Sequence, residues 1–346
     1  MKVAILIPTK NRPDFLKRAV AYYNSLNSPH PIYIGDASNP EISTQNANNL
    51  KRFGNVEVKH FHWENLNSTA TSERLAVEAK KVLGYCALHG DDDYFVPSSL
   101  TSCAKFLSKN KGYRTAQGRA AVFLLNSPGA YGKIKVLGEY WGENYFEDET
   151  SSERIKSFMK KYFVAQLSVH RADEYLEDCE FFRSIKDLTL GEIMHCLTFA
   201  IRGKSKFIDC LYMIRSVHAD RLSSPNSFVD WIMRPSWSSD LEKCIKGLSI
   251  TLSESSKMPL DQSGEFITKV LEEYLDRASL GVFHPLKKVS LSARLKNLLP
   301  MSVKNVLRPL NTLIMNDCDM RLLRSKKSRF YEDFLPVSNS LKEVSL

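Results

Sequence analysis

The first 90 residues alternate between short apolar runs and amphipathic segments, and this alternation constrains the fold more than any other feature of the chain. The first run, at residues 3–8, is β-branched and ends at a proline, and further runs predict strands at residues 31–38, 56–61 and 85–90. The segments between them show helical spacing, at residues 12–26, up to residue 53 and at 67–83, the last with an expected Ser or Thr N-cap. Strands that alternate with helices in this way predict βαβ units and a mostly parallel sheet. In such sheets, ligands bind beyond the carboxyl ends of the strands.

The pattern is less regular after Pro97. Further strands are expected at residues 120–125, 132–141, 163–171 and 206–215, and further helices at 151–163 and 187–203. From about residue 222 the sequence reads as helix and loop. We therefore predict an α/β domain over residues 1–220 and a mainly helical, basic region over residues 221–346.

Positive charge is concentrated near the C-terminus. The formal net charge is +9, and residues 287–330 alone contain eleven Lys or Arg against two Asp, so the remainder of the chain is close to neutral. Short basic, amphipathic pieces suit the anionic surface of a membrane, and they equally suit a solvated helical face that closes the domain. Both interpretations remain open from the sequence.

The composition is that of an ordinary globular protein, with 43% hydrophobic and 25% charged residues. Seven cysteines are scattered without any C-x-x-C spacing, which argues against a zinc site and a disulfide framework and predicts a reducing, cytoplasmic environment. No apolar run approaches the roughly 18 residues that span a bilayer. We expect a cytoplasmic protein, with peripheral contact to the inner face of the cytoplasmic membrane through residues 287–330 as an open alternative.

Three adjacent carboxylates, Asp91, Asp92 and Asp93, follow the predicted strand at residues 85–90. Like charges this close repel one another, and a divalent cation shared with a substrate diphosphate removes the repulsion. The alternative is a solvated acidic turn that caps a helix starting at Pro97, since acidic residues favour helix N-termini. His89, just before the triplet, is expected to be a hydrogen-bonded packing residue rather than a metal ligand.

Two further motifs lie at predicted strand ends. The first strand runs into Pro8-Thr9-Lys10-Asn11-Arg12-Pro13, and the second ends in Asp36-Ala37-Ser38. With the Asp91–Asp93 triplet followed by Pro97, this order and spacing resembles the inverting GT-A fold glycosyltransferases of family 2 and their relatives in bacterial surface-polysaccharide synthesis. The resemblance is good over residues 1–125 and fades towards residue 220. It implies a GT-A (Rossmann-like) sheet flanked by helices, followed here by the basic helical extension.

The resemblance also implies roles for the motif residues. The nucleotide is expected to contact Pro8, Thr9, Asn11, Arg12, Asp36, Asp91 and Asp92. Mn²⁺ or Mg²⁺ on the diphosphate is expected to be bound by one or two acids of the triplet, Asp92 and Asp93 aligning best. Gly90 stands where many relatives have an aspartate, and Ala37 replaces a common glycine.

Inverting transfer requires a general base that accepts the proton of the acceptor hydroxyl. In the resembled family this carboxylate follows the metal motif by some 90 to 110 residues, at the start of a helix. Asp187 and Glu192 both occupy such positions, and Asp187 also suits the role of an N-cap. After the last predicted strand, the resemblance implies His218 as a metal ligand and Arg215 as a contact for the leaving diphosphate, whereas an isolated histidine is more often structural.

The sequence therefore predicts a metal-dependent glycosyltransferase that uses a nucleotide-diphosphate sugar, with UDP-sugars the favoured donors, and a glycan or lipid-linked acceptor. A sugar-nucleotide-forming nucleotidyltransferase is disfavoured, because the loop after the first strand lacks glycine. A catalytically silent nucleotide-sugar-binding scaffold remains open because of Gly90. A nucleic-acid-binding protein that uses the basic tail is less favoured, because it leaves the acidic triplet unexplained, and no nucleic acid partner is expected.

Overall fold

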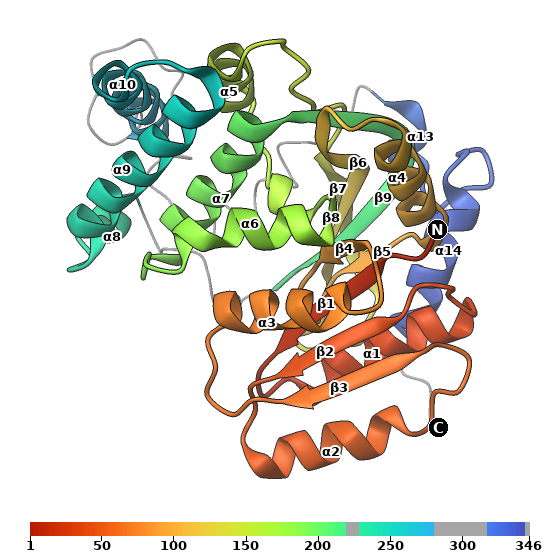
Figure 1. Ribbon diagram of the computed structural model, residues 1–346. Coiled ribbons are helices and arrows are strands. Elements are labelled where there is room, and N and C mark those ends of the chain that lie inside the picture. Colours follow the sequence, from red (N-terminus) through yellow and green to blue (C-terminus); the bar gives the residue numbers. More distant parts are fainter. Residues whose placement is uncertain (219–227, 280–316, 343–346) are drawn as a thin grey trace.

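The computed structural model describes residues 1–218, 228–279 and 317–342, and Figure 1 shows their arrangement. The N-terminal half contains β1 (Ala4–Thr9), α1 (Pro13–Ser25), β2 (Ile32–Asp36), α2 (Pro40–Leu50), β3 (Val58–His62), α3 (Ser68–Lys80) and β4 (Tyr85–Leu88). The four strands are parallel and lie in the order β3-β2-β1-β4. The predicted βαβ units and parallel sheet are confirmed.

The sheet continues with strands that the chain reaches later. Its order is β3-β2-β1-β4-β8-β6-β9-β5, and β7 pairs with β6. The additional strands are β5 (Tyr94–Phe95), β6 (Tyr113–Leu125), β7 (Ile134–Trp141), β8 (Val169–Arg171) and β9 (Lys204–Val217). β6 and β9 are parallel, whereas β5, β7 and β8 pair antiparallel with their neighbours. The result is a mixed but mostly parallel core sheet.

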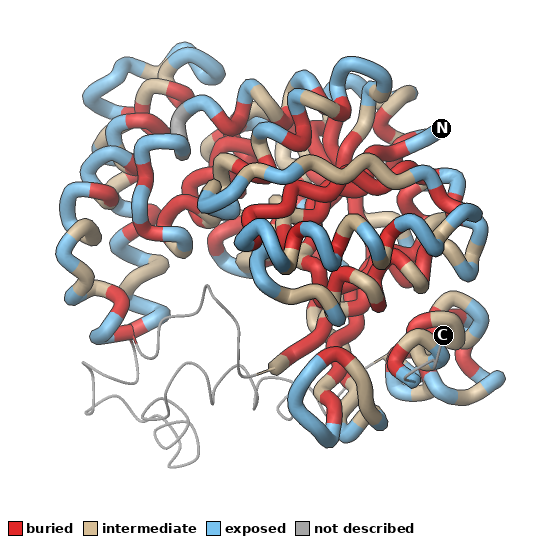
Figure 2. Tube along the Cα trace, turned by 90° about the horizontal axis from the view of Figure 1, so that it is seen from below, coloured by how far each residue is buried: buried red, intermediate tan, exposed pale blue. Residues whose placement is uncertain are grey.

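Helices cover this sheet and extend beyond it. They are α4 (Pro97–Lys109), α5 (Ser151–Lys160), α6 (Ala172–Phe182), α7 (Leu188–Arg202), α8 (Phe228–Ile232), α9 (Trp237–Ser256), α10 (Leu260–Ser279), α13 (Cys318–Arg321) and α14 (Tyr331–Ser340). Figure 2 shows that buried residues follow the central strands, while exposed residues lie on the outer faces of the helices. Packing is close at Gly35 of β2, where a Cβ would lie 2.3 Å from Thr71 Cγ2 of α3.

Several local predictions differ from the structure. The strand expected at residues 163–171 is a 3-10 turn at Ala165–Leu167 followed by the three-residue β8. The N-cap of α3 is Asn67, whose side chain accepts from Ala70 N, rather than a Ser or Thr. The helix α6 was not predicted. It begins at the residue after β8, and no Gly or Pro turn signal separates the two elements in the sequence.

The region after residue 221 packs back onto the rest of the protein in two places. Helices α9 and α10 pack together and against α7 and α5, and α14 packs against α1, as Figure 1 shows. Most of the basic segment 287–330 lies outside the described residues, which contain only its part from residue 317. Arg329 in that part contacts Asp209 and Asp319, so some of this charge is neutralised within the fold.

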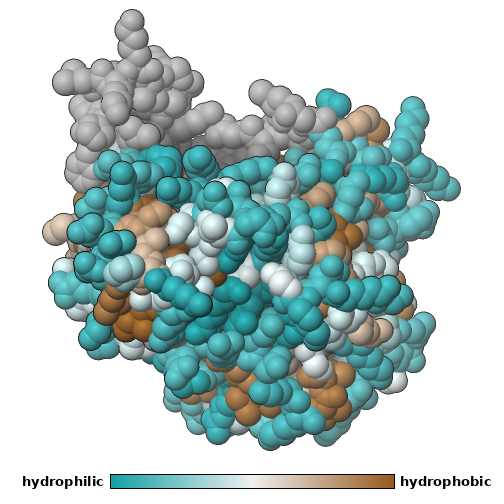
Figure 3. All heavy atoms as spheres, turned by 45° about the horizontal axis from the view of Figure 1, so that its top comes forward, coloured by the Kyte–Doolittle hydropathy of each residue, from teal (hydrophilic) through white to brown (hydrophobic). Residues whose placement is uncertain are grey.

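No helix in the described ranges combines the length and apolarity that a bilayer crossing requires. Figure 3 shows a largely hydrophilic face on which hydrophobic side chains form small, separate patches. The exposed large hydrophobic side chains include Val82, Met233 and Leu260, which lie on different elements. Scattered exposure of this kind is usual for a globular protein.

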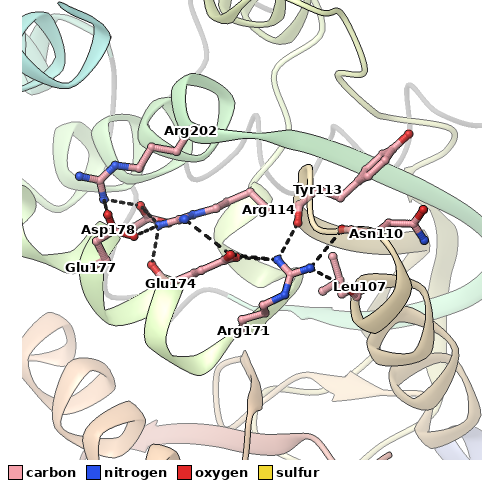
Figure 4. A network of polar contacts seen from close by, with 9 residues as sticks. All are labelled: Leu107, Asn110, Tyr113, Arg114, Arg171, Glu174, Glu177, Asp178 and Arg202. Carbon is pink, nitrogen blue, oxygen red and sulfur yellow. Dashed lines mark hydrogen bonds and ion pairs between the residues drawn. The ribbon is translucent and has the colours of Figure 1, made fainter. Parts of the chain in front are cut away.

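A buried ionic network joins β6, β8, α6 and α7 (Figure 4). Asp178 of α6 accepts from Arg114 Nε at 2.9 Å and from Arg202 Nη1 at 2.8 Å, and its side chain is fully buried. Arg171 of β8 donates to the carbonyl oxygens of Leu107 and Asn110, and so satisfies the C-terminal end of α4. The network fixes the antiparallel strand β8 between the two halves of the sheet.

His170 of β8 predicts how stability depends on pH. Burial lowers its pKa to about 3, whereas a histidine in an unfolded chain has a pKa of about 6.5. Below pH 6.5 the unfolded state therefore binds one more proton than the folded state, and stability falls by up to about 1.4 kcal/mol per pH unit as the pH decreases towards 3. Thermal melts of the wild type and His170→Gln from pH 7 to 4.5 test this: the variant should lose stability less steeply, and parallel curves would contradict the assignment.

Candidate active site

Three segments that are distant in the sequence converge at the carboxyl ends of β1 and β4. The loop after β1 carries Thr9 to Arg12, the acidic triplet follows β4, and His218 follows β9. Because β4 is the parallel neighbour of β1, their ends lie side by side. The short strand β5, directly after the triplet, pairs with β9 through Tyr94 and Ile214, which brings the end of β9 to the same place.

Asp91 faces the loop after β1. Thr9 Oγ1 donates to Asp91 Oδ2 at 2.6 Å, and Arg12 Nη1 lies 2.7 Å from Asp91 Oδ1. Burial raises the pKa of Asp91 to about 7, although the charge of Arg12 and the hydrogen bond from Thr9 act in the opposite direction. Both carboxylate oxygens of Asp91 thus bind the loop that is expected to contact the nucleotide.

Asp92 meets His218. The distance from His218 Nε2 to Asp92 Oδ2 is 2.6 Å, and Arg12 Nη2 lies 3.3 Å from the same oxygen. Arg18 of α1 has a buried side chain, and its Nη2 donates to the backbone carbonyl of Asp92 at 2.7 Å. Sequence reasoning missed Arg18, although an arginine among the apolar positions of an amphipathic helix is a signal that could have found it.

Asp93 connects the triplet to β9. Its carboxylate accepts from Arg215 Nε at 3.0 Å and from Ser216 N at 2.9 Å, which occupies both oxygens. Arg215 also donates from Nη1 to Tyr140 Oη at 2.7 Å. In this arrangement Asp93 holds β9 in place. Asp92 and Asp93 are the two aspartates expected to bind the metal, and of these two Asp92 is the one in contact with His218.

Gly90 makes room for Asp92. A Cβ at residue 90 would lie 2.5 Å from Asp92 Oδ1, closer than nonbonded atoms approach. A side chain here is therefore incompatible with the observed position of the Asp92 carboxylate. The departure from the family pattern at this residue is consistent with a working site, because the glycine allows Asp92 to reach His218.

If Asp92 binds a metal ion as the sequence predicts, replacing Gly90 by alanine should displace the Asp92 carboxylate and weaken Mn²⁺ binding by about tenfold, within the range seen when the supports of a metal ligand are altered. Titration calorimetry with MnCl₂ in the presence of UDP measures this. Gly84→Ala is the matched control, because nothing lies within 4 Å of a Cβ at that position, and it should leave the affinity unchanged. Equal affinities for all three proteins would show that Gly90 does not position Asp92.

His89 is a packing residue, as expected. Its Nδ1 lies 2.6 Å from the carbonyl oxygen of Gly90, and its Nε2 lies 2.8 Å from Tyr23 Oη. Tyr23 Oη in turn accepts from Phe95 N at 2.8 Å, so the tyrosine donates to Nε2 and Nδ1–H donates to Gly90. These bonds fix the backbone on both sides of the triplet.

Asp36 is fully buried at the end of β2. Burial alone raises its pKa, but the hydrogen bonds from His60, Asn46 and Ser38 outweigh that effect and hold the pKa of Asp36 below its ordinary value. As placed here, its carboxylate orients these three side chains and faces no solvent. The half-buried His60 lies beside it, with its Nε2 3.0 Å from Asp36, and the nucleotide contact expected of Asp36 stays a prediction.

The loops after β1 and β2 are tied together. Pro8 and Thr9 of β1 are in register with Gly35 and Asp36 of β2. Asn11 adopts a left-handed conformation (φ 56°), and its backbone N–H donates to Ser38 Oγ at 2.7 Å. Asparagine tolerates this left-handed conformation better than most residues, so Asn11 suits the turn between Pro8 and Pro13.

The two candidate bases differ in their surroundings. Asp187 is the N-cap of α7, accepting from Thr189 N and Leu190 N, and it also accepts from Trp231 and Arg234. Glu192, one turn into the helix and half-buried, accepts from Tyr162 Oη at 3.0 Å. The N-cap interpretation of Asp187 is confirmed, and four donors surround its carboxylate.

The described residues contain no group of three or more His, Cys, Asp or Glu side chains that could hold a metal ion. Mg²⁺ and Mn²⁺ are commonly bound by one or two protein ligands together with substrate phosphates and water. Asp92 and His218 provide such a pair, and His218 Nδ1 is buried with no hydrogen-bond partner in the ranges described. The residues present therefore fit an ion that the substrate helps to coordinate.

No protein-family model and no curated protein matches the sequence. Among solved structures, the crystal structure of residues 1–349 of S. aureus TarS aligns with a TM-score of 0.50 and 11% identity, over 99% of this chain and 89% of that chain. The chain has the GT-A fold. The same TarS fragment has also been solved in complex with UDP and with UDP-GlcNAc, and these structures align equally well. The GT-A fold predicted from the three motifs is thereby confirmed.

Proposed function

We propose that the protein is a metal-dependent glycosyltransferase that moves a sugar from a nucleotide-diphosphate sugar to a hydroxyl acceptor. The observation that carries this proposal is the convergence of Asp92, His218 and Arg12 at the carboxyl end of the sheet. The GT-A fold shared with TarS, which has been crystallised with UDP and UDP-GlcNAc, supports a UDP-sugar as the donor.

The donor site is assigned as follows. The turn from Pro8 to Arg12 and the end of β2 at Asp36 receive the nucleotide, with Asp91 supporting the turn through Thr9. Asp92 and His218 bind Mn²⁺ or Mg²⁺, with Asp93 in the supporting role that its contacts to Arg215 and Ser216 give it. A bound divalent ion supplies positive charge for the leaving diphosphate.

Arg215 is positioned to assist the departure of the diphosphate. Its Nε and Nη1 are held by Asp93 and Tyr140, which fixes the plane of the guanidinium, and its centre lies 4.7 Å from the Tyr140 ring. A guanidinium held in this way stabilises developing negative charge without reorganising.

Glu192 is the proposed general base, and inversion at the anomeric carbon is proposed from the resemblance to inverting family 2 glycosyltransferases. The Glu192 carboxylate accepts from Tyr162 Oη at 3.0 Å and is proposed to accept the proton of the acceptor hydroxyl. Asp187 is the second candidate, and its four donors hold it in place as the N-cap of α7. Glu192→Gln should lower the rate of transfer and leave donor binding intact.

The acceptor is proposed to be a glycan or lipid-linked sugar in bacterial surface glycan synthesis, with the enzyme on the cytoplasmic side of the membrane. Residues 1–220 form the catalytic domain in this account, and residues 287–330 contact anionic lipid. Co-sedimentation with anionic liposomes, with and without residues 287–346, tests the membrane contact. Equal binding by the two proteins would exclude it.

The experiment that tests the function is a panel of UDP-, GDP-, CMP- and dTDP-sugars, measured by thermal shift with and without MnCl₂. We expect stabilisation by at least one UDP-sugar that depends on Mn²⁺, because a ligand bound only to the folded state raises its stability. Stabilisation followed by no sugar transfer to any acceptor would favour a silent binding scaffold. Absence of any metal-dependent stabilisation would exclude the donor site.

A further inference from the structure

Arg12 lies between the two proposed metal ligands. Its Nη2 is 2.8 Å from His218 Nε2 and 3.3 Å from Asp92 Oδ2, and these two ligand atoms are 2.6 Å apart. Its other amino group, Nη1, is 2.7 Å from Asp91 Oδ1. One guanidinium thus contacts all three side chains that would otherwise be joined by a cation.

The arginines of the site differ in what they contact, and Arg12 is in contact with both Asp92 and His218. Arg215 is anchored through two nitrogens on β9, and Arg18 is buried in α1. Arg12 instead stands in the loop before α1, its side chain is 20% exposed, and its guanidinium rests on the Phe15 ring at 4.2 Å. Phe15 also packs against the His218 ring, with 5.0 Å between ring centroids.

We propose that Arg12 is an internal counter-ion, which lies against Asp92 and His218 in the metal-free protein and moves to the donor diphosphate when metal and donor bind together. This inference rests on the proposed function and adds a coupling mechanism to it. Arg12 and a divalent cation cannot both lie close to Asp92 Oδ2, because both are positive and compete for the lone pairs of the same oxygen.

The exchange couples the two ligands. In the presence of metal alone, Arg12 must give up its contacts to Asp92 and His218 and finds no new anion. With a nucleoside diphosphate present, the same guanidinium can form paired hydrogen bonds to phosphate oxygens, which match its fork geometry. The protein should therefore bind Mn²⁺ weakly alone and more tightly with UDP, and Arg12 should account for part of that difference.

The test is titration calorimetry of MnCl₂ into the full chain, with and without saturating UDP. Without UDP, Arg12→Gln should bind Mn²⁺ about tenfold more tightly than the wild type. This factor corresponds to the loss of one charge-assisted contact that competes with the metal ion. The factor by which UDP improves Mn²⁺ binding should decrease by a similar amount. Arg52→Gln is the matched control. Arg52 is exposed and follows the C-terminal end of α2, so this variant should reproduce the wild type.

Arg12→Lys provides a second variant that keeps the positive charge. A single ammonium cannot contact Asp91, Asp92 and His218 in the way the fork does, so its Mn²⁺ affinity without UDP should lie between those of the wild type and Arg12→Gln. Unchanged or weaker Mn²⁺ binding by both variants, while the wild type binds Mn²⁺ with UDP, would overturn this inference and leave the proposed function standing. Failure of the wild type to bind Mn²⁺ even with UDP would remove the metal site itself.

Discussion

Replacing Asp92 by asparagine is expected to lower sugar transfer by at least about a hundredfold, the scale for losing one group that stabilises transition-state charge. The substitution keeps the shape of the side chain and removes its negative charge. His218 and Arg12 then lose the anion that holds them together, and the proposed metal ligand pair is reduced to His218. The measurement is the transfer rate together with the Mn²⁺ dependence of the melting temperature.

The neighbouring aspartate supplies the contrast for this experiment. Asp93→Asn removes the next carboxylate of the triplet, which has different contacts, to Arg215 and Ser216. We expect it to lower the stability of the metal-free protein more than Asp92→Asn does, while retaining Mn²⁺-dependent stabilisation. Asp261→Asn on the exposed surface of α10 should change neither quantity. If Asp93→Asn alone abolished the metal effect, the assignment of the two aspartates would be reversed.

The second large effect is on folding. Asp178→Ala should destabilise the protein by about 3–5 kcal/mol, because it leaves Arg114 and Arg202 buried without their shared carboxylate. The free energy of unfolding in urea measures this loss. The network in Figure 4 also holds β8 in the sheet, so the variant should unfold at lower denaturant concentration with an unchanged slope.

Glu177→Ala is the matched control for this network. Glu177 also contacts Arg114, at 2.6 Å, but its side chain is 53% exposed, so solvent screens the pair. Its loss should cost no more than about 1 kcal/mol. Equal effects of the two substitutions would show that burial does not decide the strength of these ion pairs.

The N-terminal half of the fold was predictable because local patterns and tertiary structure agree there. Strands β1, β2 and β4 are largely buried and therefore appear as apolar runs, and α1 between the first two carries regular apolar spacing. The edge strand β3 is only partly buried. The carboxyl ends of parallel strands share one edge, so the position of the Asp91–Asp93 triplet near Thr9 and Arg12 also followed from the sequence.

Other features depend on contacts between distant segments, and local patterns do not encode them. The strands β5 and β8 contain two and three residues and exist only because β9, β4 and β6 pair with them. The pairing of Asp93 with Arg215 is set by the register of β5 against β9. Asp187 is surrounded by Trp231 and Arg234, which come from a region beyond the residues covered by the family resemblance.

The most direct test of the donor site is to locate Mn²⁺ in crystals grown with MnCl₂ and UDP, from anomalous scattering measured at the manganese absorption edge. The account predicts one strong peak in contact with Asp92 Oδ2 and His218 Nε2, with the UDP diphosphate completing the coordination and Arg12 displaced from its position between the two ligands. A peak bound by Asp93 instead, or UDP bound at this edge of the sheet with no manganese, would contradict it.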